Sequence, residues 1–414
     1  MDKTVVELFA GVGGFRVGFN HITKIDQDGR AIENPNFDFV WANQWEPSTS
    51  IQPAFQCYQK RFGESTSHVN KDIAKVDAKD IPNHTVLVGG FPCQDYSVAR
   101  SLSGEKGIQG KKGVLFWEII RIIKEKQTPF ILLENVDRLL KSPSKQRGRD
   151  FGIMLRALGD LGYLVQWRII NAADYGHPQR RRRVFIFAAK NNTKYFSKIS
   201  SLNPRDVITQ FGIFSNRFQV NTLSHVVESD FLSTYTDLVT VSDKFHFSFE
   251  NAGVYLDGKI TTGKANPILS QQFQLQSILD EKIDDDTLYL KDSQIKKFEY
   301  LKGAKKVPRT SLNGMQYFYS EGGMAFPDDL TSPARTMLTS EGTINRSTHV
   351  VQDPISKQLR KLSPNECEKI NEFPAGWTNS GMSKNKRYFM MGNALVCGVV
   401  RKLGDTISEV ITSE

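Results

Sequence analysis

Short apolar segments rich in Val, Ile and Phe recur through the first 190 residues of the chain. They lie at residues 5–9, 37–42, 85–88, 130–133, 165–170 and 184–188. Their length and β-branching predict buried strands. Between them, apolar side chains recur at the 3.6-residue spacing of a helix, for example at Leu115, Ile119, Ile122 and Ile123. Alternation of strands and helices indicates an α/β fold with a mostly parallel sheet.

The pattern changes after residue 190. Residues 191–355 are polar, aromatic and rich in Ser and Thr, with a weak helical period and turn signals such as Asn313-Gly314. Regular structure returns after Leu359 and ends in an apolar segment over residues 394–403. We therefore expect a first domain over 1–190, a smaller inserted domain over 191–355, and a segment, 356–414, that returns to complete the first domain.

The charge balance points to a polyanionic partner. The chain has 54 Lys and Arg against 45 Asp and Glu, a formal net charge of +9. The positive side chains cluster, most densely in the unbroken Arg run at residues 180–183 and at Lys111-Lys112 between glycines. Solubility alone explains a modest net charge, but the clustering favours nucleic acid.

Membrane proteins and metalloproteins are disfavoured by simpler features. No segment approaches the roughly 20 apolar residues of a membrane span, and the first residues lack a secretory pattern, so we expect a cytoplasmic protein without membrane contact. The four cysteines, Cys57, Cys93, Cys367 and Cys397, lie far apart and form no C-x-x-C pair. This spacing predicts free thiols, with neither a metal site nor a disulfide framework.

Two motifs follow strands, at the edge of the sheet where α/β proteins bind ligands. The glycines of residues 9–14, FAGVGG, let a ligand approach the backbone. Their spacing is not the G-x-G-x-x-G of dinucleotide-binding folds. Residues 89–94, GGFPCQ, follow another strand, and Pro92 stiffens the loop that presents the Cys93 thiol. We interpret Cys93 as a nucleophile rather than a core residue.

Two charged motifs also occupy strand ends. Glu134 closes the apolar run at residues 130–133, where a carboxylate is costly to desolvate unless it is paired or protonated. A protonated carboxyl can serve as a proton donor, whereas a capping role for Asn135 is the alternative. In the Arg run, alternation along a strand places Arg181 and Arg183 on one face. One of these faces can point at a site. The alternative is that the Arg side chains are solvated charge on the surface.

Taken in order, these motifs resemble those of the DNA cytosine-C5 methyltransferase family, in its bacterial restriction–modification type. Residues 360–367, RKLSPNEC, look like the family's ninth motif, and residues 391–394, MGNA, like its tenth. The resemblance covers residues 1–190 and 356–414. It implies a Rossmann-like, S-adenosylmethionine-dependent methyltransferase fold, with residues 191–355 as an inserted target-recognition domain.

The resemblance also implies a binding site for S-adenosyl-L-methionine. Its expected residues are Phe9, Gly11, Gly13, Gly14, Gln44, Trp45, Glu46, Asp72, Ile73, Pro92, Leu115, Asn393 and Ala394. Trp45 resembles the aromatic residue that lies against the adenine. The family usually has an acidic residue one place before this aromatic, for the ribose hydroxyls, whereas this chain has Gln44 there and Glu46 on the other side. Which of the two binds the ribose stays open.

Four residues are expected by resemblance to be catalytic: Cys93, Glu134, Arg181 and Arg183. Cys93 adds to C6 of a cytosine that has been flipped out of the duplex, and protonated Glu134 offsets the charge that develops at N3. Arg183 is expected near the cytosine O2, with Arg181 supporting the pocket. Residues 96–113, rich in Gly and Lys, are expected to close over the extruded base as a lid.

Double-stranded DNA with a specific short site is the expected partner. Its candidate contacts are Arg100, Lys111, Lys112, Gln179 and Arg335. We further expect a monomer without metal, whose cognate restriction endonuclease is encoded in a separate chain. Three alternatives remain: an RNA cytosine methyltransferase that acts on tRNA, a catalytically silent DNA-binding protein on the same scaffold, and a dinucleotide-dependent enzyme.

Overall fold

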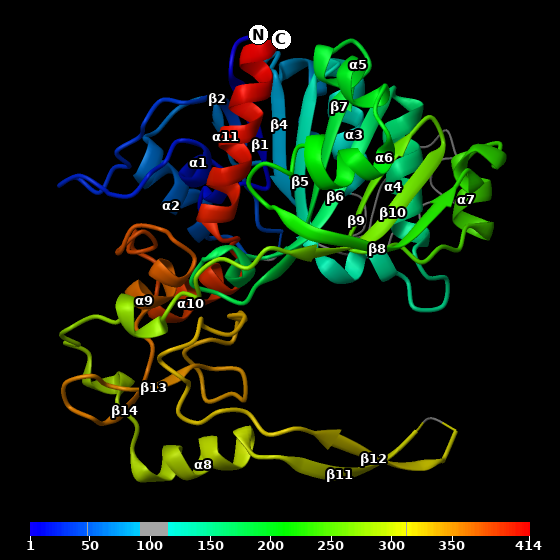
Figure 1. Cartoon of the computed structure of the whole chain (residues 1–414). Helices are drawn as coiled ribbons and strands as arrows, with labels where there is room; N and C mark the ends of the chain where they lie inside the picture. The colour runs from blue at the N-terminus through cyan, green and yellow to red at the C-terminus, as the bar shows by residue number, and fades with distance from the viewer. Residues whose placement is uncertain (48, 92–114, 312) are drawn as a thin grey trace.

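A ten-stranded sheet organises most of the molecule (Figure 1). The computed structural model describes residues 1–47, 49–91, 115–311 and 313–414. The strand order across the sheet is β3-β2-β1-β4-β5-β7-β6-β9-β10-β8. The strands are β1 (Thr4–Leu8), β2 (Asp38–Asn43), β3 (His68–Val69), β4 (Val86–Gly90), β5 (Phe130–Val136), β6 (Tyr163–Asn171), β7 (Arg182–Lys190), β8 (Val220–Ser229), β9 (Ala252–Leu256) and β10 (Lys259–Pro267).

One half of the sheet is parallel and the other half is antiparallel. β3, β2, β1, β4 and β5 pair in parallel, whereas every neighbouring pair from β5 to β8 is antiparallel. The expectation of a mostly parallel sheet is therefore wrong for the second half. β6 and β7 are joined only by residues 172–181, and parallel neighbours need a crossover of about a dozen residues or more.

The sheet also continues past residue 190, where we expected the first domain to end. β9 pairs with β6, so that the outer edge of β6 is covered, and β10 and β8 extend the sheet further. β8 and β10 contain Asn, Thr, Ser and Lys where the earlier strands have apolar runs, so their pattern did not predict strands of this sheet. The boundary expected near residue 191 therefore needs correction, because the last strand of this sheet along the chain, β10, ends at Pro267.

Helices cover both faces of the sheet. Successive strand residues alternate between two cores. Val5 lies in the core that also contains residues of α1, α2, α5 and α11, and Val6 lies in the core that contains residues of α3, α4 and α7. These helices are α1 (Gly14–Phe19), α2 (Pro53–Phe62), α3 (Leu115–Lys126), α4 (Arg149–Asp160), α5 (Lys194–Ser200), α7 (Leu238–Lys244) and α11 (Cys397–Ser413). The three layers confirm the predicted α/β class.

The C-terminal segment packs against the N-terminal one. α11 lies beside α1, and the two chain ends lie close together in Figure 1. The contact is tight, because a Cβ at Gly18 of α1 would lie 2.8 Å from the carbonyl oxygen of Cys397. In the same segment, Trp377 Nε1 donates a 2.8 Å hydrogen bond to the carbonyl of Val12. The end of the chain therefore supports the Gly-rich loop after β1.

A smaller part of the molecule lies below the sheet in Figure 1. Its elements are η7 (Leu275–Ile278), η8 (Asp286–Leu288), α8 (Asp292–Lys302), β11 (Lys305–Thr310), β12 (Gln316–Glu321), β13 (Val350–Gln352), β14 (Leu359–Lys361), α9 (Pro364–Ile370) and α10 (Lys384–Asn393). Short turns in the large part are η1 (Ile73–Lys75), η2 (Ala78–Asp80), η3 (Asp137–Lys141), η4 (Ala172–Tyr175), α6 (Pro204–Asp206), η5 (Val207–Phe211) and η6 (Phe231–Thr234). Among the described residues, none of the helices has the length and apolar character needed to cross a membrane.

Candidate active site

A cavity of about 820 Å³ lies where the carboxyl ends of β1, β2, β4 and β5 meet. The loops after these strands line it, together with the start of α3, the start of β7 and the C-terminal segment. The expected site residues on its wall are Phe9, Gly11, Gly14, Gln44, Trp45, Glu46, Asp72, Ile73, Leu115, Glu134, Arg181, Arg183, Asn393 and Ala394. The fold thus gathers residues from both ends of the chain around one space.

The loop after β1 has an unusual backbone conformation. Phe9 and Gly11 have φ angles of 54° and 57°, a region that glycine adopts readily and other residues rarely. Gln44 Oε1 accepts a 2.7 Å hydrogen bond from the Gly11 N–H and so fixes the loop to the end of β2. A Cβ built on Gly11 would meet no atom within 4 Å. Open space therefore reaches the backbone here, as close approach of a ligand requires.

Gly13 packs closely against α2. It lies off the cavity wall, its φ is 90°, and a Cβ there would lie 2.5 Å from the ring of Phe62 on α2. The absence of a side chain lets α2 pack against the loop. The cofactor contact expected of Gly13 stays a prediction.

The segment after β2 presents Trp45 and Glu46 to the cavity. Gln52 holds this segment, because its side chain accepts a hydrogen bond from the Glu46 N–H at 2.7 Å and donates one to the Glu46 carbonyl at 2.9 Å. The Glu46 carboxylate lies at the start of α2, with Oε2 3.5 Å from the Ala54 nitrogen. Trp45 remains 37% exposed, so its ring is available to a ligand.

Asp72 and Ile73 form the neighbouring wall at the start of η1. Asp72 accepts a 3.2 Å hydrogen bond from the Ala74 N–H, and Ile73 is buried. Asn43 at the end of β2 donates to the carbonyls of Val69 and Lys71, at 3.2 and 2.8 Å. This contact holds the segment that carries Asp72 beside the end of β2.

Glu134 and Arg183 form an ion pair on the cavity wall, with 2.9 Å between Glu134 Oε1 and Arg183 Nε. Strand register brings the two side chains together, because Arg183 lies opposite Val136, which is two residues after Glu134 on the same face of β5. On the other side of β5, Gly90 of β4 lies beside Glu134. A Cβ on Gly90 would lie 3.2 Å from Glu134 Oε2, so the glycine leaves room for the carboxylate. Both charged side chains are mostly buried, and each offsets the desolvation of the other.

Asn135 holds the backbone just before the predicted nucleophile. Its buried Nδ2 donates a 2.8 Å hydrogen bond to the carbonyl oxygen of Phe91, and its Oδ1 accepts from the Val136 N–H. The end of β5 is thereby tied to the end of β4. Pro92, Cys93, Arg100, Lys111 and Lys112, together with the expected lid over residues 96–113, lie outside the described residues.

The other three cysteines are packed in the core. Cys57, Cys367 and Cys397 are fully buried, and burial raises the pKa of the Cys57 thiol to about 11. Burial likewise raises the pKa values of Cys367 and Cys397 well above the ordinary thiol value. Because the thiolate is the nucleophilic form, these three thiols are unsuited to attack a substrate, which leaves Cys93 as the candidate.

Arg181 and Gln179 join the start of β7 to two distant segments. Buried Arg181 donates to the carbonyls of Met337 and Gly392, at 3.2 and 3.0 Å. Gln179 accepts from the Met337 N–H at 3.1 Å and donates to Asn371 Oδ1 at 2.7 Å. The expectation that Gln179 contacts DNA is wrong, because its side chain is fully buried between protein partners.

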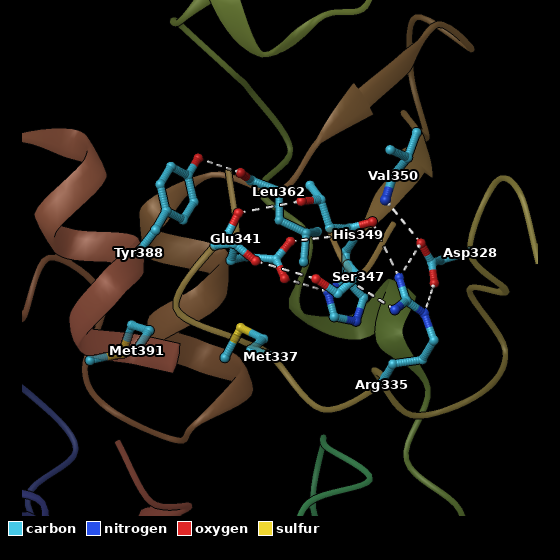
Figure 2. A network of polar contacts seen from close by, with 12 residues as sticks. Asp328, Arg335, Met337, Glu341, Ser347, His349, Val350, Leu362, Tyr388 and Met391 are labelled. Carbon is cyan, nitrogen blue, oxygen red and sulfur yellow. Dashed lines mark hydrogen bonds and ion pairs between the residues drawn. The ribbon is translucent and has the colours of Figure 1, made fainter. Parts of the chain in front are cut away.

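Arg335 is also engaged within the protein (Figure 2). Its Nε and Nη2 donate to the Asp328 carboxylate at 2.6 and 3.2 Å. Nη1 donates to the carbonyl of Ser347 at 2.9 Å, and Nη2 also donates to that of Thr348 at 3.3 Å. The expectation that Arg335 reads a base is corrected, since its guanidinium is used to hold these loops together.

Glu7 was not anticipated from the sequence. Its side chain is fully buried within β1, two residues before Phe9, and the Tyr58 hydroxyl donates a 3.0 Å hydrogen bond to its Oε2. Burial raises the pKa of Glu7 to about 8, although Tyr58 and Arg16 act in the opposite direction. An acidic residue inside an apolar strand was the signal for it. This carboxyl contributes to the support under the Gly-rich loop.

Comparison with known proteins relates the chain to methyltransferases. The chain is 50% identical over 409 residues to the Type II methyltransferase M.Sau3AI of Staphylococcus aureus. The aligned region covers 98% of this chain and 95% of that protein. It is 36% identical over 196 residues to the Type II methyltransferase M.NgoBI of Neisseria gonorrhoeae, or 47% of this chain and 53% of that protein.

The fold is similar to that of the S. pombe Dnmt2 methyltransferase, with a TM-score of 0.58 at 16% identity over 99% of this chain and 98% of that one. A family model described as C-5 cytosine-specific DNA methylase matches residues 3–409, which include every strand of the sheet and every described residue on the cavity wall. The chain therefore belongs to the C-5 cytosine-specific DNA methylase family.

Proposed function

We propose that this protein transfers a methyl group from S-adenosylmethionine to C5 of a cytosine that is flipped out of a specific short site in double-stranded DNA. The observation that carries the proposal is the single cavity, whose wall combines the Gly-rich loop and Trp45 with the Glu134–Arg183 ion pair. A pocket suited to the cofactor and a polar pocket suited to a base share one space. Such proximity is what a group transfer between two bound molecules requires.

Several features of the cavity fit S-adenosylmethionine. The open space beside Gly11 admits a ligand against the backbone, and Trp45 offers an aromatic face for the adenine. Asp72 and Asn393 add polar groups around the same space. A volume of about 820 Å³ lies within the range of small-molecule sites. When bound, the cofactor supplies an electrophilic methyl group.

Of the two candidates for the ribose hydroxyls, we propose Glu46. Gln44 Oε1 already accepts a hydrogen bond from Gly11, whereas the Glu46 carboxylate lies at the cavity and, among the described residues, makes one long contact, to Ala54. Glu46→Gln should raise the cofactor Kd by about tenfold, in line with charged hydrogen bonds, as measured by calorimetric titration. Gln44→Ala, in contrast, should lower thermal stability by releasing the loop. Unchanged affinity in Glu46→Gln would argue against this assignment.

The proposed chemistry assigns one task to each polar side chain. The Cys93 thiolate adds to C6 of the cytosine, which makes C5 nucleophilic, while the Glu134 carboxyl shares a proton with N3 to offset the charge that develops there, and Arg183 lies near O2. After C5 has gained the methyl group, loss of the C5 proton and departure of the Cys93 sulfur restore the aromatic ring. The hydrogen bond from Asn135 to Phe91 supports this role, since it holds the backbone just before Cys93.

The covalent step can be tested with duplex DNA that carries 5-fluorocytosine at the methylated position. Fluorine cannot leave C5 as a proton does, so the wild-type protein should form an adduct that survives a denaturing gel. Cys93→Ser should form none, and Cys57→Ser, which changes a core thiol, should still form it. An adduct with Cys93→Ser would overturn the assignment of the nucleophile.

We propose duplex DNA rather than tRNA as the substrate, because the matching family model describes DNA methylases. Methyl incorporation into duplex DNA and into tRNA, measured side by side, separates the two. Arg100, Lys111 and Lys112 remain proposed phosphate contacts. We also propose that residues 268–352, rather than 191–355, recognise the target, and that a cognate endonuclease is encoded separately, as in the restriction–modification systems that this chain resembles.

A further inference from the structure

The hairpin β11–β12 projects from the smaller part of the molecule, beyond α8 (Figure 1). All of its strand residues are exposed except the first of β11 and the last of β12, so neither face of the ribbon is covered. An isolated two-stranded hairpin is marginally stable in water. A hairpin with two uncovered faces therefore depends on a firm base, and its surface is available to a partner.

Arg346 holds the base of the hairpin. Its guanidinium donates to the carbonyls of Leu301 and Gly303, at 2.6 and 3.2 Å, just before β11. It also donates to the carbonyl of Gly322 just after β12, and lies 3.5 Å from the Glu321 carboxylate. One side chain thus ties the two ends of the hairpin together and so positions the strands between them.

A buried ion pair joins this base to the network of Figure 2. Lys302, at the end of α8, lies 3.0 Å from the Asp328 carboxylate, and both side chains are almost fully buried. Asp328 in turn accepts hydrogen bonds from Arg335 and from the Val350 N–H. The hairpin is therefore mounted on the same loops that Arg181 connects, through Met337, to the wall of the cavity.

The exposed surface of the hairpin combines aromatic rings with hydrogen-bonding and cationic groups. Tyr317 and Tyr319 share a face with Arg309, whose guanidinium lies 4.2 Å from the Tyr319 ring centroid. Phe318, 70% exposed, shares the opposite face with Gln316. Within residues 305–321 the chain has three Lys and Arg side chains against one Glu. Uncovered aromatic surface marks an interaction site, and the positive charge favours a polyanion.

We propose that hairpin β11–β12 enters the major groove of the DNA and reads bases beside the target cytosine, an inference that rests on the proposed function. Adjacent strands lie about 5 Å apart, so the ribbon with its side chains fits a groove about 12 Å wide. Arg309 and Gln316 carry the paired groups that recognise guanine and adenine edges. Lys306, nearer the base of the hairpin, is suited to a phosphate.

A shortened hairpin tests the inference directly. Replacing residues 308–318 by Asn-Gly closes a two-residue turn after the Val307–Tyr319 pair and leaves the Arg346 contacts in place. Thermal stability and S-adenosylmethionine affinity should be unchanged, because the hairpin contributes no residue to the cavity wall. The kcat/KM for duplex DNA should fall by about a hundredfold or more, toward that of non-specific sequence.

Single substitutions give a finer test. Arg309→Ala and Gln316→Ala should each raise the Kd for the cognate duplex by about tenfold and relax the base preference at one position of the methylated site. Sequencing of the methylated DNA reads this preference. Lys24→Ala, which removes an exposed cation from the large part of the molecule, is the matched control and should change Kd by less than about twofold.

The outcomes separate this inference from the proposed function. Absence of any DNA methylation by the full-length wild-type protein would contradict the proposed function itself. Site-selective methylation by the shortened hairpin at the wild-type rate would overturn the inference and leave the enzyme assignment standing. A loss of self-association on shortening, seen by sedimentation with DNA recognition unchanged, would overturn it in favour of a second copy of the chain as the partner.

Discussion

Glu7 lies inside β1 with its side chain fully buried, and burial raises its pKa from 4.5 to about 8. Between these two pH values the folded protein keeps a proton that the unfolded chain has released. Stability from this group is therefore fully present below about pH 4.5 and is lost as the pH rises toward 8, where the buried carboxyl ionises. This loss of stability at higher pH is due to one residue, so one substitution can remove it.

Glu7→Gln should flatten the dependence of thermal stability on pH. The amide can still accept the hydrogen bond from Tyr58, and it does not ionise. Between about pH 5 and pH 8, the Tm of the wild type should fall relative to that of the variant, by an amount equivalent to a few kcal/mol. Calorimetry across this range measures the difference. Parallel curves for the two proteins would show that Glu7 does not change its protonation there.

Glu134→Gln should slow methyl transfer far more than it weakens DNA binding, because an amide can hydrogen-bond to N3 but cannot deliver a proton. A loss of about 10²–10⁴-fold in the single-turnover rate is expected for a general acid. Asp137→Asn is the matched control, since Asp137, at the start of η3 just after β5, forms an exposed ion pair with Arg182 of β7. A wild-type rate in Glu134→Gln would leave the carboxyl without a chemical role.

Among elements, the contact between α10 and the segment at residues 337–339 is unusually close. A Cβ on Gly392 would lie 2.4 Å from the backbone of Leu338 and Thr339. The Gly392 carbonyl also accepts a hydrogen bond from Arg181. Because Asn393 is the next residue and lies on the cavity wall, the placement of a cofactor-facing residue depends on this glycine.

Gly392→Ala should therefore destabilise the protein by about 1–3 kcal/mol and weaken cofactor binding at the same time. The added methyl group meets backbone atoms, which cannot rotate away as a side chain can. Thermal unfolding and calorimetric titration measure the two effects. Gly322→Ala is the control, because a Cβ there meets no atom within 4 Å. If both variants behave alike, the close contact does not limit the position of α10.

At the scale of the whole molecule, the sheet sets which segments can be exchanged. β8, β9 and β10 belong to the ten-stranded sheet although they follow residue 190, and β9 covers the edge of β6. Residues 268–352 lie outside that sheet. A segment that determines the methylation site should thus be exchangeable only if the exchange leaves β8, β9 and β10 in place.

Exchanging residues 268–352 for the matching segment of a relative should transfer the methylation site of that relative and keep activity. Exchanging residues 191–355 should give a less stable and less active protein, because foreign strands would have to pair with β6. Sequencing of methylated DNA and thermal unfolding of the two chimeras measure these effects. An active 268–352 chimera that keeps the original site would place specificity in the large part of the molecule.

Elements whose information is local could be predicted from the amino-acid sequence. The apolar runs that became β1, β4, β5 and β7 predicted strands because buried strands need continuous apolar side chains. Motifs at the ends of these strands then predicted a shared site, since adjacent parallel strands end at one edge. Gly11 and Glu134 were expected at this edge for that reason, the family resemblance added Trp45, and all three lie on one cavity wall. The Thr- and Ser-containing strands β8 and β10 had no such run, and their membership of the sheet was not predicted.

The roles of individual polar side chains, in contrast, depend on the folded chain. Gln179 and Arg335 are chemically suited to read bases, and nothing in their own segments shows otherwise. Gln179 is buried because its partners, Met337 and Asn371, arrive from 158 and 192 positions away. Arg335 is held by Asp328, and Gly13 is needed because Phe62 packs on it. Burial and pairing depend on which distant atoms the fold brings to a side chain, and local sequence does not contain that information.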